Sequence, residues 1–279
     1  MPCDSGADSR VRPVPPAWPA RGTPTGTTVY DRTMASRDAI VAHANEILEV
    51  ERWPEFGAPG LQVIGAPEVS RIACGVSSSR ELFERAVAWG AELVLVHHGL
   101  FWRNEPLVVD ARLRGRLEAL FRGNASLAAY HLALDAHPLL GNSAQLAARI
   151  GATADGPFAG VGLSCVVEPQ PLATLVARVE EATGREPLVF AYGPAEIARV
   201  AVSTGAAGYD LIRAAHEGFD LLLTGEPEEP SLQTARELGI HLVAAGHHAT
   251  ERLGVQALAT HLAERFGLEW SYFEVDNPV

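Results

Sequence analysis

Leu93-Val94-Leu95-Val96-His97-His98-Gly99 is an apolar run that ends in two adjacent histidines. A short, uninterrupted apolar run of this kind is typical of a strand that is buried on both faces of a sheet. The histidines lie where this strand leaves the sheet, and imidazole is the commonest metal-coordinating side chain. The run therefore predicts a buried strand that ends in two candidate metal ligands.

An internal repeat surrounds this strand. The segment from Arg71 to His98 aligns without a gap with the segment from Arg199 to Glu226. Each copy predicts a strand, a turn of small residues, a helix and a second strand. Together with the alternation of strand-like and helix-like segments elsewhere, the repeat predicts an α/β fold with two pseudo-repeated lobes. Glu226 takes the position of His98 in the second copy, and both a functional and a structural role stay open for it.

The repeat also suggests how the chain divides. We expect residues 34–124, together with about 240–279, to form the first α/β lobe, and residues 125–239 to form the second. Residues 1–33 are rich in Pro, Gly, Thr and Arg and show no apolar period. We expect them to be a disordered N-terminal tail, or the result of a start site placed too early. They lack the continuous apolar core of a signal peptide.

A second, weaker similarity between the two halves follows each copy of the repeat. Apolar residues lead to His131, with Asp135 four residues later, and a second apolar run leads to His247, with Glu251 four residues later. Each half therefore supplies a strand that ends in His-x-x-x-carboxylate. Open α/β sheets place their sites at the carboxyl ends of strands. Two related halves would bring these side chains to a shared cleft.

The candidate metal ligands are three imidazoles and two carboxylates: His97, His98, Asp135, His247 and Glu251. This donor set suits Zn, Fe, Mn or Co and suits Ca poorly. Five protein ligands are more than one catalytic metal usually takes, because a position stays open for water or substrate. Two divalent metal ions would use all five ligands. The sequence thus predicts a dinuclear metal site in the cleft between the lobes.

Ordinary structural interpretations exist for the same residues. Asp135 could cap a helix or turn, and Glu251 could be a first-turn carboxylate favoured by the helix dipole. The agreement between the two halves of the repeat favours the ligand interpretation. His131 and His248 neighbour the predicted site in the sequence, and both are candidate proton carriers.

Composition excludes several classes of function. The formal net charge of -12 argues against a nucleic-acid surface, which needs clustered basic charge. No apolar stretch reaches the roughly 18 residues of a membrane span. All 22 basic residues are arginines, which excludes a phosphate-binding Walker lysine, Schiff-base chemistry and a lysine general base. The cysteines, Cys3, Cys74 and Cys165, are far apart, as expected in the reducing cytoplasm.

Over residues 38–279 the motifs resemble the dinuclear-metal-centre hexameric proteins of the Nif-three-like family, known also as GTP cyclohydrolase I type 2 homologues. The similarity is greatest to the short bacterial members. Five segments carry the resemblance: His97-His98-Gly99-Leu100-Phe101-Trp102, His131-Leu132-Ala133-Leu134-Asp135-Ala136-His137-Pro138, Gly141-Asn142-Ser143-Ala144-Gln145-Leu146-Ala147, Leu223-Thr224-Gly225-Glu226 and Gly246-His247-His248-Ala249-Thr250-Glu251-Arg252.

The resemblance implies a two-domain α/β fold that assembles as a ring-shaped homohexamer. From the composition we expect a cytoplasmic location and neither a nucleic-acid nor a membrane partner. It also implies two divalent metal ions per subunit, Zn, Fe or Mn, at the five ligands given above. His131 belongs to the same family pattern. Gly99 stands where the family also allows proline.

The function that follows from the resemblance is a metal-dependent hydrolase of the GTP cyclohydrolase type. Metal-bound hydroxide would attack C8 of a purine nucleotide such as GTP. One alternative is a phosphoesterase that uses the same two metals. A further alternative is a non-catalytic, metal-binding hexameric scaffold, chaperone or regulatory protein.

Overall fold

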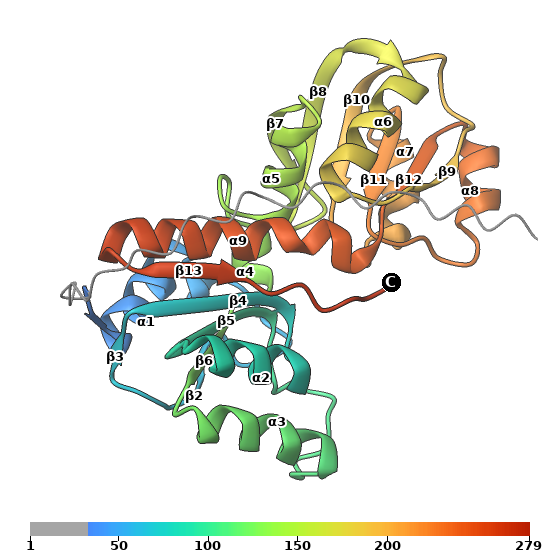
Figure 1. Ribbon diagram of the computed structural model, residues 1–279. Helices are drawn as coiled ribbons and strands as arrows, with labels where there is room; N and C mark the ends of the chain where they lie inside the picture. Colours follow the sequence, from blue (N-terminus) through green and yellow to red (C-terminus); the bar gives the residue numbers. More distant parts are fainter. Residues whose placement is uncertain (1–32) are drawn as a thin grey trace, which may run out of the picture. The chain divides into compact units, whose positions relative to one another are not determined.

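Two large β-sheets with helices on both faces, and one small two-stranded sheet, lie within residues 33–279, the part of the chain that the computed structural model describes (Figure 1). This arrangement confirms the predicted α/β class with two lobes. The expected disordered tail, residues 1–33, lies outside the described residues except for Thr33.

The first sheet has five strands in the order β13-β4-β5-β6-β2. Its strands are β2 (Gly60–Val63), β4 (Arg71–Ser77), β5 (Leu93–His98), β6 (Ser126–Ala129) and β13 (Glu269–Tyr272). Only β2 runs antiparallel to its neighbour. The predicted strand that ends in the histidine pair is therefore the central strand of this sheet.

Alternate residues of β4 and β5 face opposite sides of this sheet, as the two-residue period of a strand requires. Cys74 and Leu95 pack with α1 and α9, whereas Ala73 and Val94 pack with α2 and α3. The four helices are α1 (Arg37–Ile47), α2 (Arg80–Trp89), α3 (Ala111–Arg122) and α9 (His247–Phe266). Both faces are apolar because both are covered.

The second sheet has six strands in the order β7-β8-β10-β11-β12-β9. Its strands are β7 (Thr153–Phe158), β8 (Gly162–Pro171), β9 (Leu188–Phe190), β10 (Glu196–Ser203), β11 (Leu221–Thr224) and β12 (His241–Ala244). One face packs against α5 (Asn142–Arg149) and α6 (Leu172–Thr183). The other packs against α7 (Leu211–His216) and α8 (Ser231–Leu238).

Short elements connect these layers. They are β1 (Ala35–Ser36), β3 (Glu68–Val69), the 3-10 turns η1 (Val50–Arg52) and η2 (Gly208–Asp210), and α4 (Leu132–Asp135).

Strand pairing reproduces the internal repeat. In the first copy β4 pairs in parallel with β5, and in the second β10 pairs in parallel with β11. The equivalent residues have equivalent partners, since Ile72 pairs with Leu93 and Val200 pairs with Leu221. In each lobe a third parallel strand follows, β6 or β12, and its end leads to the His-x-x-x-carboxylate segment.

At each of the two predicted lobe limits, the structure places one strand in the sheet of the other lobe. β6 follows residue 124 but pairs with β5 in the first sheet, and β12 follows residue 240 but pairs with β11 in the second. The physical reason is that each third strand extends the sheet of its own repeat copy. The division into domains itself stays a prediction.

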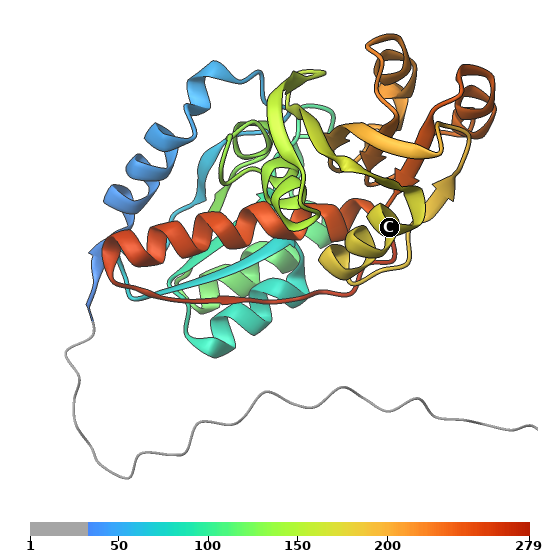
Figure 2. The same cartoon turned by 90° about the horizontal axis from the view of Figure 1, so that it is seen from above.

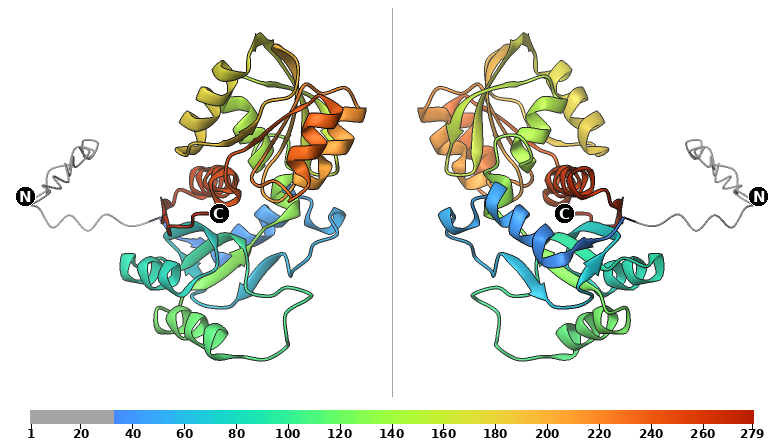
Figure 3. Two further views of the ribbon diagram at one scale, coloured as in Figure 1. Left: turned by 90° about the vertical axis from the view of Figure 1, so that its right-hand side faces the viewer. Right: turned by 90° about the vertical axis from the view of Figure 1, so that its left-hand side faces the viewer.

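Helix α9 joins the two lobes. It begins after β12 of the second sheet and then runs along the first sheet (Figure 2). Leu253 near its start belongs to the core of the second lobe, whereas Leu258 and Leu262 belong to the core of the first. Figure 3 views α9 nearly end-on, between the two sheets. No helix within residues 33–279 is long and apolar enough to cross a membrane.

Candidate metal centre

The five predicted ligands come together from three elements. His97 and His98 are the last two residues of β5, and Asp135 is the last residue of α4. His247 and Glu251 lie one helical turn apart at the start of α9. Of the five, His97, Asp135 and Glu251 are buried. The structure therefore brings together the whole set that the sequence singles out.

Each of the three histidines is held through its Nδ1 atom. The Nδ1 atoms of His97, His98 and His247 lie 2.9, 2.9 and 2.6 Å from the Tyr130 carbonyl oxygen, Ser77 Oγ and Glu226 Oε1, respectively. The carbonyl and the carboxylate can only accept, so Nδ1 of His97 and His247 donates there. Partners of this kind fix the tautomer and the ring orientation of metal-binding histidines.

The Nε2 atoms of the same three rings converge on the two carboxylates. His98 Nε2 and His247 Nε2 each lie 3.1 Å from Glu251 Oε2. His97 Nε2 lies 3.5 Å from Glu251 Oε1 and 3.5 Å from Asp135 Oδ2. Glu251 is therefore at the centre of the cluster.

Asp135 is fixed by a side chain that the sequence analysis did not single out. Asn142 is fully buried and donates through Nδ2 to Asp135 Oδ1 at 2.8 Å. Its Oδ1 accepts a hydrogen bond from the Gly254 amide of α9 at 2.7 Å. Asn142 thus ties Asp135 to the helix that carries His247 and Glu251.

Gly205 lies against Glu251 from the second lobe. Its φ is +69°, and a Cβ atom at this position would overlap Glu251 Oε1. Its amide donates to Thr250 Oγ1 at 3.1 Å. A glycine is required here because both the backbone conformation and the space exclude a side chain.

The charges in the cluster shift one another. Burial lowers the pKa of His97, but Asp135 and Glu251 outweigh burial and raise it to about 9. Burial is likewise outweighed at His247, where Glu251 and Glu226 raise the pKa to about 9. Although burial favours its neutral acid, the surrounding histidines hold the pKa of Glu251 well below its usual value. Burial raises the pKa of Asp135.

The cluster has the donors that a metal site needs. Two sets have ligand atoms within 4.8 Å of one another: His97, His98 and His131, and His98, His247 and Glu251. His97 Nε2 and Glu251 Oε2 are buried, and neither makes a hydrogen bond of good geometry with residues 33–279. Buried polar atoms normally have a partner. These histidine and glutamate groups can bind metal ions.

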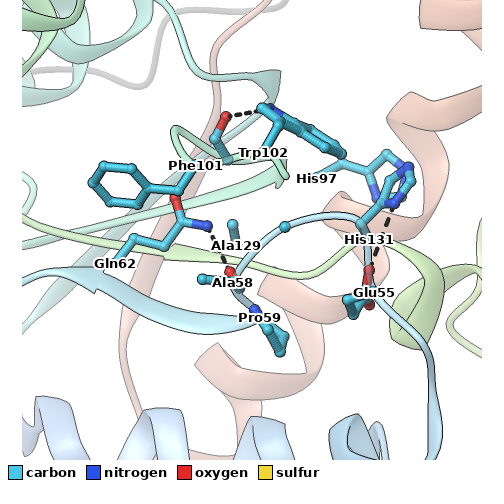
Figure 4. Close-up of a pocket in the computed structure, with 11 residues that line it drawn as sticks. Glu55, Ala58, Pro59, Gln62, His97, Phe101, Trp102, Ala129 and His131 are labelled. Atoms are coloured by element: carbon cyan, nitrogen blue, oxygen red, sulfur yellow. Dashed lines mark hydrogen bonds and ion pairs between the residues drawn. The ribbon is translucent and has the colours of Figure 1, made fainter. Parts of the chain in front are cut away.

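His131 lies beside the cluster but is held differently. Its ring centroid is 4.9 Å from that of His97 and 5.4 Å from that of His98. Its Nδ1 lies 3.6 Å from Glu55 Oε2, and Figure 4 shows this contact next to His97. Glu55 in turn accepts the amides of Leu132 and Ala133 at 3.1 and 2.8 Å. This position is consistent with the predicted proton carrier.

The structure does not bring His248 to this cluster. Its Nε2 lies 2.6 Å from Glu274 Oε1, and its ring lines a separate pocket together with the Ser77–Ser79 turn. The physical reason is that successive residues of a helix point about 100° apart. His247 and His248 open α9, so only one of them can face Glu251. Of the two predicted proton carriers, His131 is the one that lies beside the cluster, and its role in proton transfer stays a prediction.

Sequence reasoning missed Glu55, Asn142 and Ser77 as partners of site residues. Asn142 belongs to a segment that carries the family resemblance, but its sequence alone also fits an ordinary helix start. Ser77 was visible only as part of a small-residue turn. Glu226 had an open role, and the structure places its carboxylate on His247.

A two-lobed α/β fold with a buried histidine–carboxylate cluster defines a class of candidate metal-binding proteins. The chain belongs to the Duf34/NIF3 (NGG1p interacting factor 3) family, whose model matches residues 35–278. A relative from Pseudomonas aeruginosa is 43% identical over 246 residues, 86% of this chain and 97% of the relative. One from Neisseria meningitidis is 41% identical over 248 residues, 88% of this chain and 100% of the relative. Both are named GTP cyclohydrolase 1 type 2 homolog.

Solved structures show the same fold. Protein ybgI, described as of unknown function, has a TM-score of 0.85 and 38% identity, over 88% of this chain and 100% of its own. Protein TTHA1606 from Thermus thermophilus has a TM-score of 0.83 and 32% identity, with the same coverage of both chains.

Proposed function

We propose that this protein is a metal-dependent hydrolase of the cyclohydrolase type, which holds two divalent metal ions and opens the five-membered ring of a purine. One observation supports the proposal above others. Three imidazoles, each held through Nδ1, direct Nε2 at two buried carboxylates. The names of the relatives point to the same reaction class.

The donor set fits such ions. A neutral Nε2 lone pair that faces a carboxylate oxygen is repulsive unless a proton or a metal ion lies between them. His97 Nε2 faces oxygens of both Asp135 and Glu251 and makes no hydrogen bond of good geometry among the described residues. The residues that would hold the ions are the five predicted ligands: His97, His98, Asp135, His247 and Glu251. When bound, two such ions would lower the pKa of a water molecule and polarise the carbon that the water attacks.

Proton transfer falls to the chain's own side chains. Ring opening adds one water molecule across the C8–N9 bond of the purine, which leaves a formamide, and N9 gains a proton as the bond breaks. His131 lines the cleft next to the ligands. We assign this proton to the His131 ring and assign Glu55, at 3.6 Å from Nδ1, to holding that ring.

The test combines metal content with product analysis. Protein loaded with Zn, Mn or Fe(II) is expected to hold two ions per subunit by elemental mass spectrometry. Incubation with GTP or guanosine should then give a product heavier by one water molecule, with loss of the purine absorbance. Two bound ions in folded protein without any such product would contradict a cyclohydrolase and favour a non-catalytic metal carrier. Cleavage of phosphoesters instead would favour a phosphoesterase.

Variants separate the assigned roles. Glu251→Gln and Asp135→Asn should lose metal and product together. His131→Asn should keep its metal but lose roughly 100- to 10,000-fold in rate, as expected for a general acid. His216→Asn, an exposed histidine on α7, is the matched control and should change neither property.

A further inference from the structure

A small cavity lies at the edge of the first sheet, apart from the candidate metal centre. Its volume is about 180 Å³, and none of the five candidate ligands lines it. Sites for drug-sized ligands usually need roughly 300 Å³ or more, so this cavity fits a small ion or a small group of a larger molecule. No step of the proposed function uses it.

The strand order places this cavity where ligands commonly bind. From β4 the chain passes through α2 to β5 on one side, whereas β13 reaches the other side of β4 through α9 (Figure 1). The two helices pack on opposite faces of the sheet. Because β13 and β4 are parallel, their carboxyl ends lie at the same edge. Open α/β sheets bind ligands in the crevice outside two such strand ends.

The lining comes from the segments that follow these two strands. Ser77 ends β4, and Ser78 and Ser79 lead into α2, while residues 273 and 275–277 follow β13. Ser79 Oγ accepts the Leu82 amide at 3.1 Å. The other amides of the first turn have no acceptor within the helix, and this end of a helix favours negative charge. The cavity therefore lies at an end of α2 that suits an anion.

Two buried side chains of the lining lack partners, which is independent of the helix end. Ser78 is 4% exposed and His248 is 7% exposed, and both residues line the cavity. Ser78 Oγ and His248 Nδ1 make no hydrogen bond with residues 33–279. Buried polar atoms normally have a partner, which can be an ordered water molecule or a ligand. Both atoms therefore point to an occupant of the cavity.

The charge of the lining comes from one arginine and one carboxylate. Arg116 of α3 has no ion-pair partner among the described residues, and burial together with Arg112 lowers its pKa. An anion would oppose both of these effects. Asp276 is exposed, lines the same cavity and acts against an anion. The end of α2 adds about half a positive charge, so the guanidinium and the helix end together outweigh Asp276.

Hydrogen-bond chemistry selects among small anions. His248 Nε2 lies 2.6 Å from Glu274 Oε1, and because a carboxylate only accepts, Nε2 donates. In a neutral ring Nδ1 is then an acceptor that needs a donor, whereas Arg116 and the helix amides offer only donors. Hydrogen phosphate has acceptor oxygens and one hydroxyl group, so it satisfies both kinds of partner. Sulfate has acceptor oxygens only.

We propose that this cavity is a second binding site, for a phosphate-type oxyanion that carries one hydroxyl group: free hydrogen phosphate, or the singly protonated phosphate group of a small monoester. Arg116 and the first amides of α2 bind its oxygen atoms, and His248 Nδ1 accepts its hydroxyl group. The site is one hydrogen bond away from the candidate metal centre, since Ser77 Oγ lies 2.9 Å from His98 Nδ1. It does not rest on the proposed function.

The first test measures binding in the full chain. Metal is removed with a chelator, so that no phosphate is held by metal ions, and inorganic phosphate is titrated by calorimetry. We expect one saturable site per chain. A dissociation constant above about 10 mM would contradict the proposal.

Variants then locate the site. Arg116→Gln should weaken phosphate binding roughly 10- to 100-fold, the range for a hydrogen bond to a charged group. Arg122→Gln, an exposed arginine of the same helix, is the matched control and should have no effect. Ser78→Ala should weaken binding about 2- to 10-fold. Asp276→Asn should tighten it by up to about fivefold, as for an exposed charge.

Equal phosphate affinity in wild type, Arg116→Gln and Ser78→Ala would mean that the cavity holds ordered water only, and the proposal would then be wrong. Sulfate that binds as tightly as phosphate would overturn it too, because sulfate has no hydroxyl group. Methyl phosphate separates the two sources. At pH 8 it is a dianion without a hydroxyl group, so inorganic phosphate should bind more tightly. At pH 6 methyl phosphate regains a proton, and equal binding there would identify a small monoester as the occupant, whereas absent binding would identify free phosphate.

Discussion

Gly205 limits what the candidate metal centre can tolerate. Gly205→Ala would place a Cβ atom against Glu251 Oε1 at a backbone φ of +69°. Because Glu251 contacts three of the candidate ligands, we expect a folded protein whose metal content falls by half or more. Elemental mass spectrometry with circular dichroism tests this. The matched control is Gly160→Ala, where φ is +93° and nothing lies within 4 Å of the new Cβ. An equal loss of metal in both variants would mean that backbone strain, and not the contact with Glu251, causes the loss.

Glu226 positions the candidate ligand His247 and is not itself one of the five candidate ligands. Its Oε1 lies 2.6 Å from His247 Nδ1 and leaves Nε2 directed at Glu251. Glu226→Ala should weaken metal binding roughly 10- to 100-fold, the usual effect of removing such a partner. Glu226→Gln, which keeps an acceptor oxygen, should recover part of the affinity. Competition with a chromogenic chelator measures both, and equal affinity in Glu226→Ala and wild type would remove this role.

Glu55 couples stability to pH. Burial alone would raise its pKa, but His131 and the amides of Ala133 and Leu132 outweigh burial and lower it. A carboxylate with a lowered folded pKa stabilises the protein above its unfolded pKa, and that stabilisation is lost as pH falls below about 4.5. Glu55→Gln should therefore cost about 1–3 kcal/mol at pH 7. The difference from wild type should shrink toward pH 4 in urea unfolding, and a constant difference would contradict this account.

At the scale of elements, α9 serves both the site and the core. Its first turns carry His247 and Glu251, while Leu258 and Leu262 pack in the first lobe. Leu258 is fully buried, so Leu258→Ala should lower the free energy of unfolding by about 2–5 kcal/mol. The exposed substitution Glu264→Ala on the same helix should change it by less than about 0.5 kcal/mol. Chemical denaturation measures both. Similar values for the two would mean that α9 is not essential to the core.

The sequence was most informative where local pattern and chemistry coincide. The apolar run before His97 and His98 predicted a buried strand, because a strand that is buried on both faces has an unbroken run of apolar residues. The structure then placed this strand at the centre of the first sheet. The repeat then predicted the equivalent strands of the second lobe and the positions of His247 and Glu251. These predictions needed only periodicity and alignment within the chain.

Long-range placement was what the sequence could not supply. Glu55 accepts hydrogen bonds from the amides of Leu132 and Ala133, which lie 77 and 78 residues further along the chain. No local sequence pattern predicts such a contact. The choice between His131 and His248 depended on which way the first turn of α9 faces. The same limit affected β6 and β12, whose sheet membership depends on pairing and not on their own apolar composition.

At the scale of the whole molecule, the candidate centre connects two lobes. Three candidate ligands come from β5 and α4, on the side of the first sheet. They meet His247 and Glu251, which follow β12 of the second sheet in the chain. Metal bound there stabilises the folded state by mass action, by about 3 kcal/mol at a hundredfold excess over the dissociation constant. Chelation should therefore lower the melting temperature by roughly 5–10 °C. The double variant Asp135→Asn with Glu251→Gln should show no such shift in calorimetry, and a shift there would mean the chelator acts elsewhere.

The predicted ring-shaped homohexamer and the predicted cytoplasmic location stay predictions. An apolar stretch, Leu107, Val108 and Val109, is largely exposed in the single chain. Exposed apolar patches of this kind are typical of surfaces that another molecule covers.

The order of the candidate ligands along the chain determines when the complete ligand set is present during synthesis. During synthesis His97 is made 154 residues before Glu251 (251 − 97), and α9 is made after β5 and α4, the other two elements that carry candidate ligands. Until then the nascent first lobe lacks both the carboxylate at the centre of the cluster and the helix that covers one face of its sheet. The complete set of five candidate ligands would therefore exist only once α9 has been made. A chain interrupted before α9 would lack His247 and Glu251 and the helix that packs on one face of the first sheet.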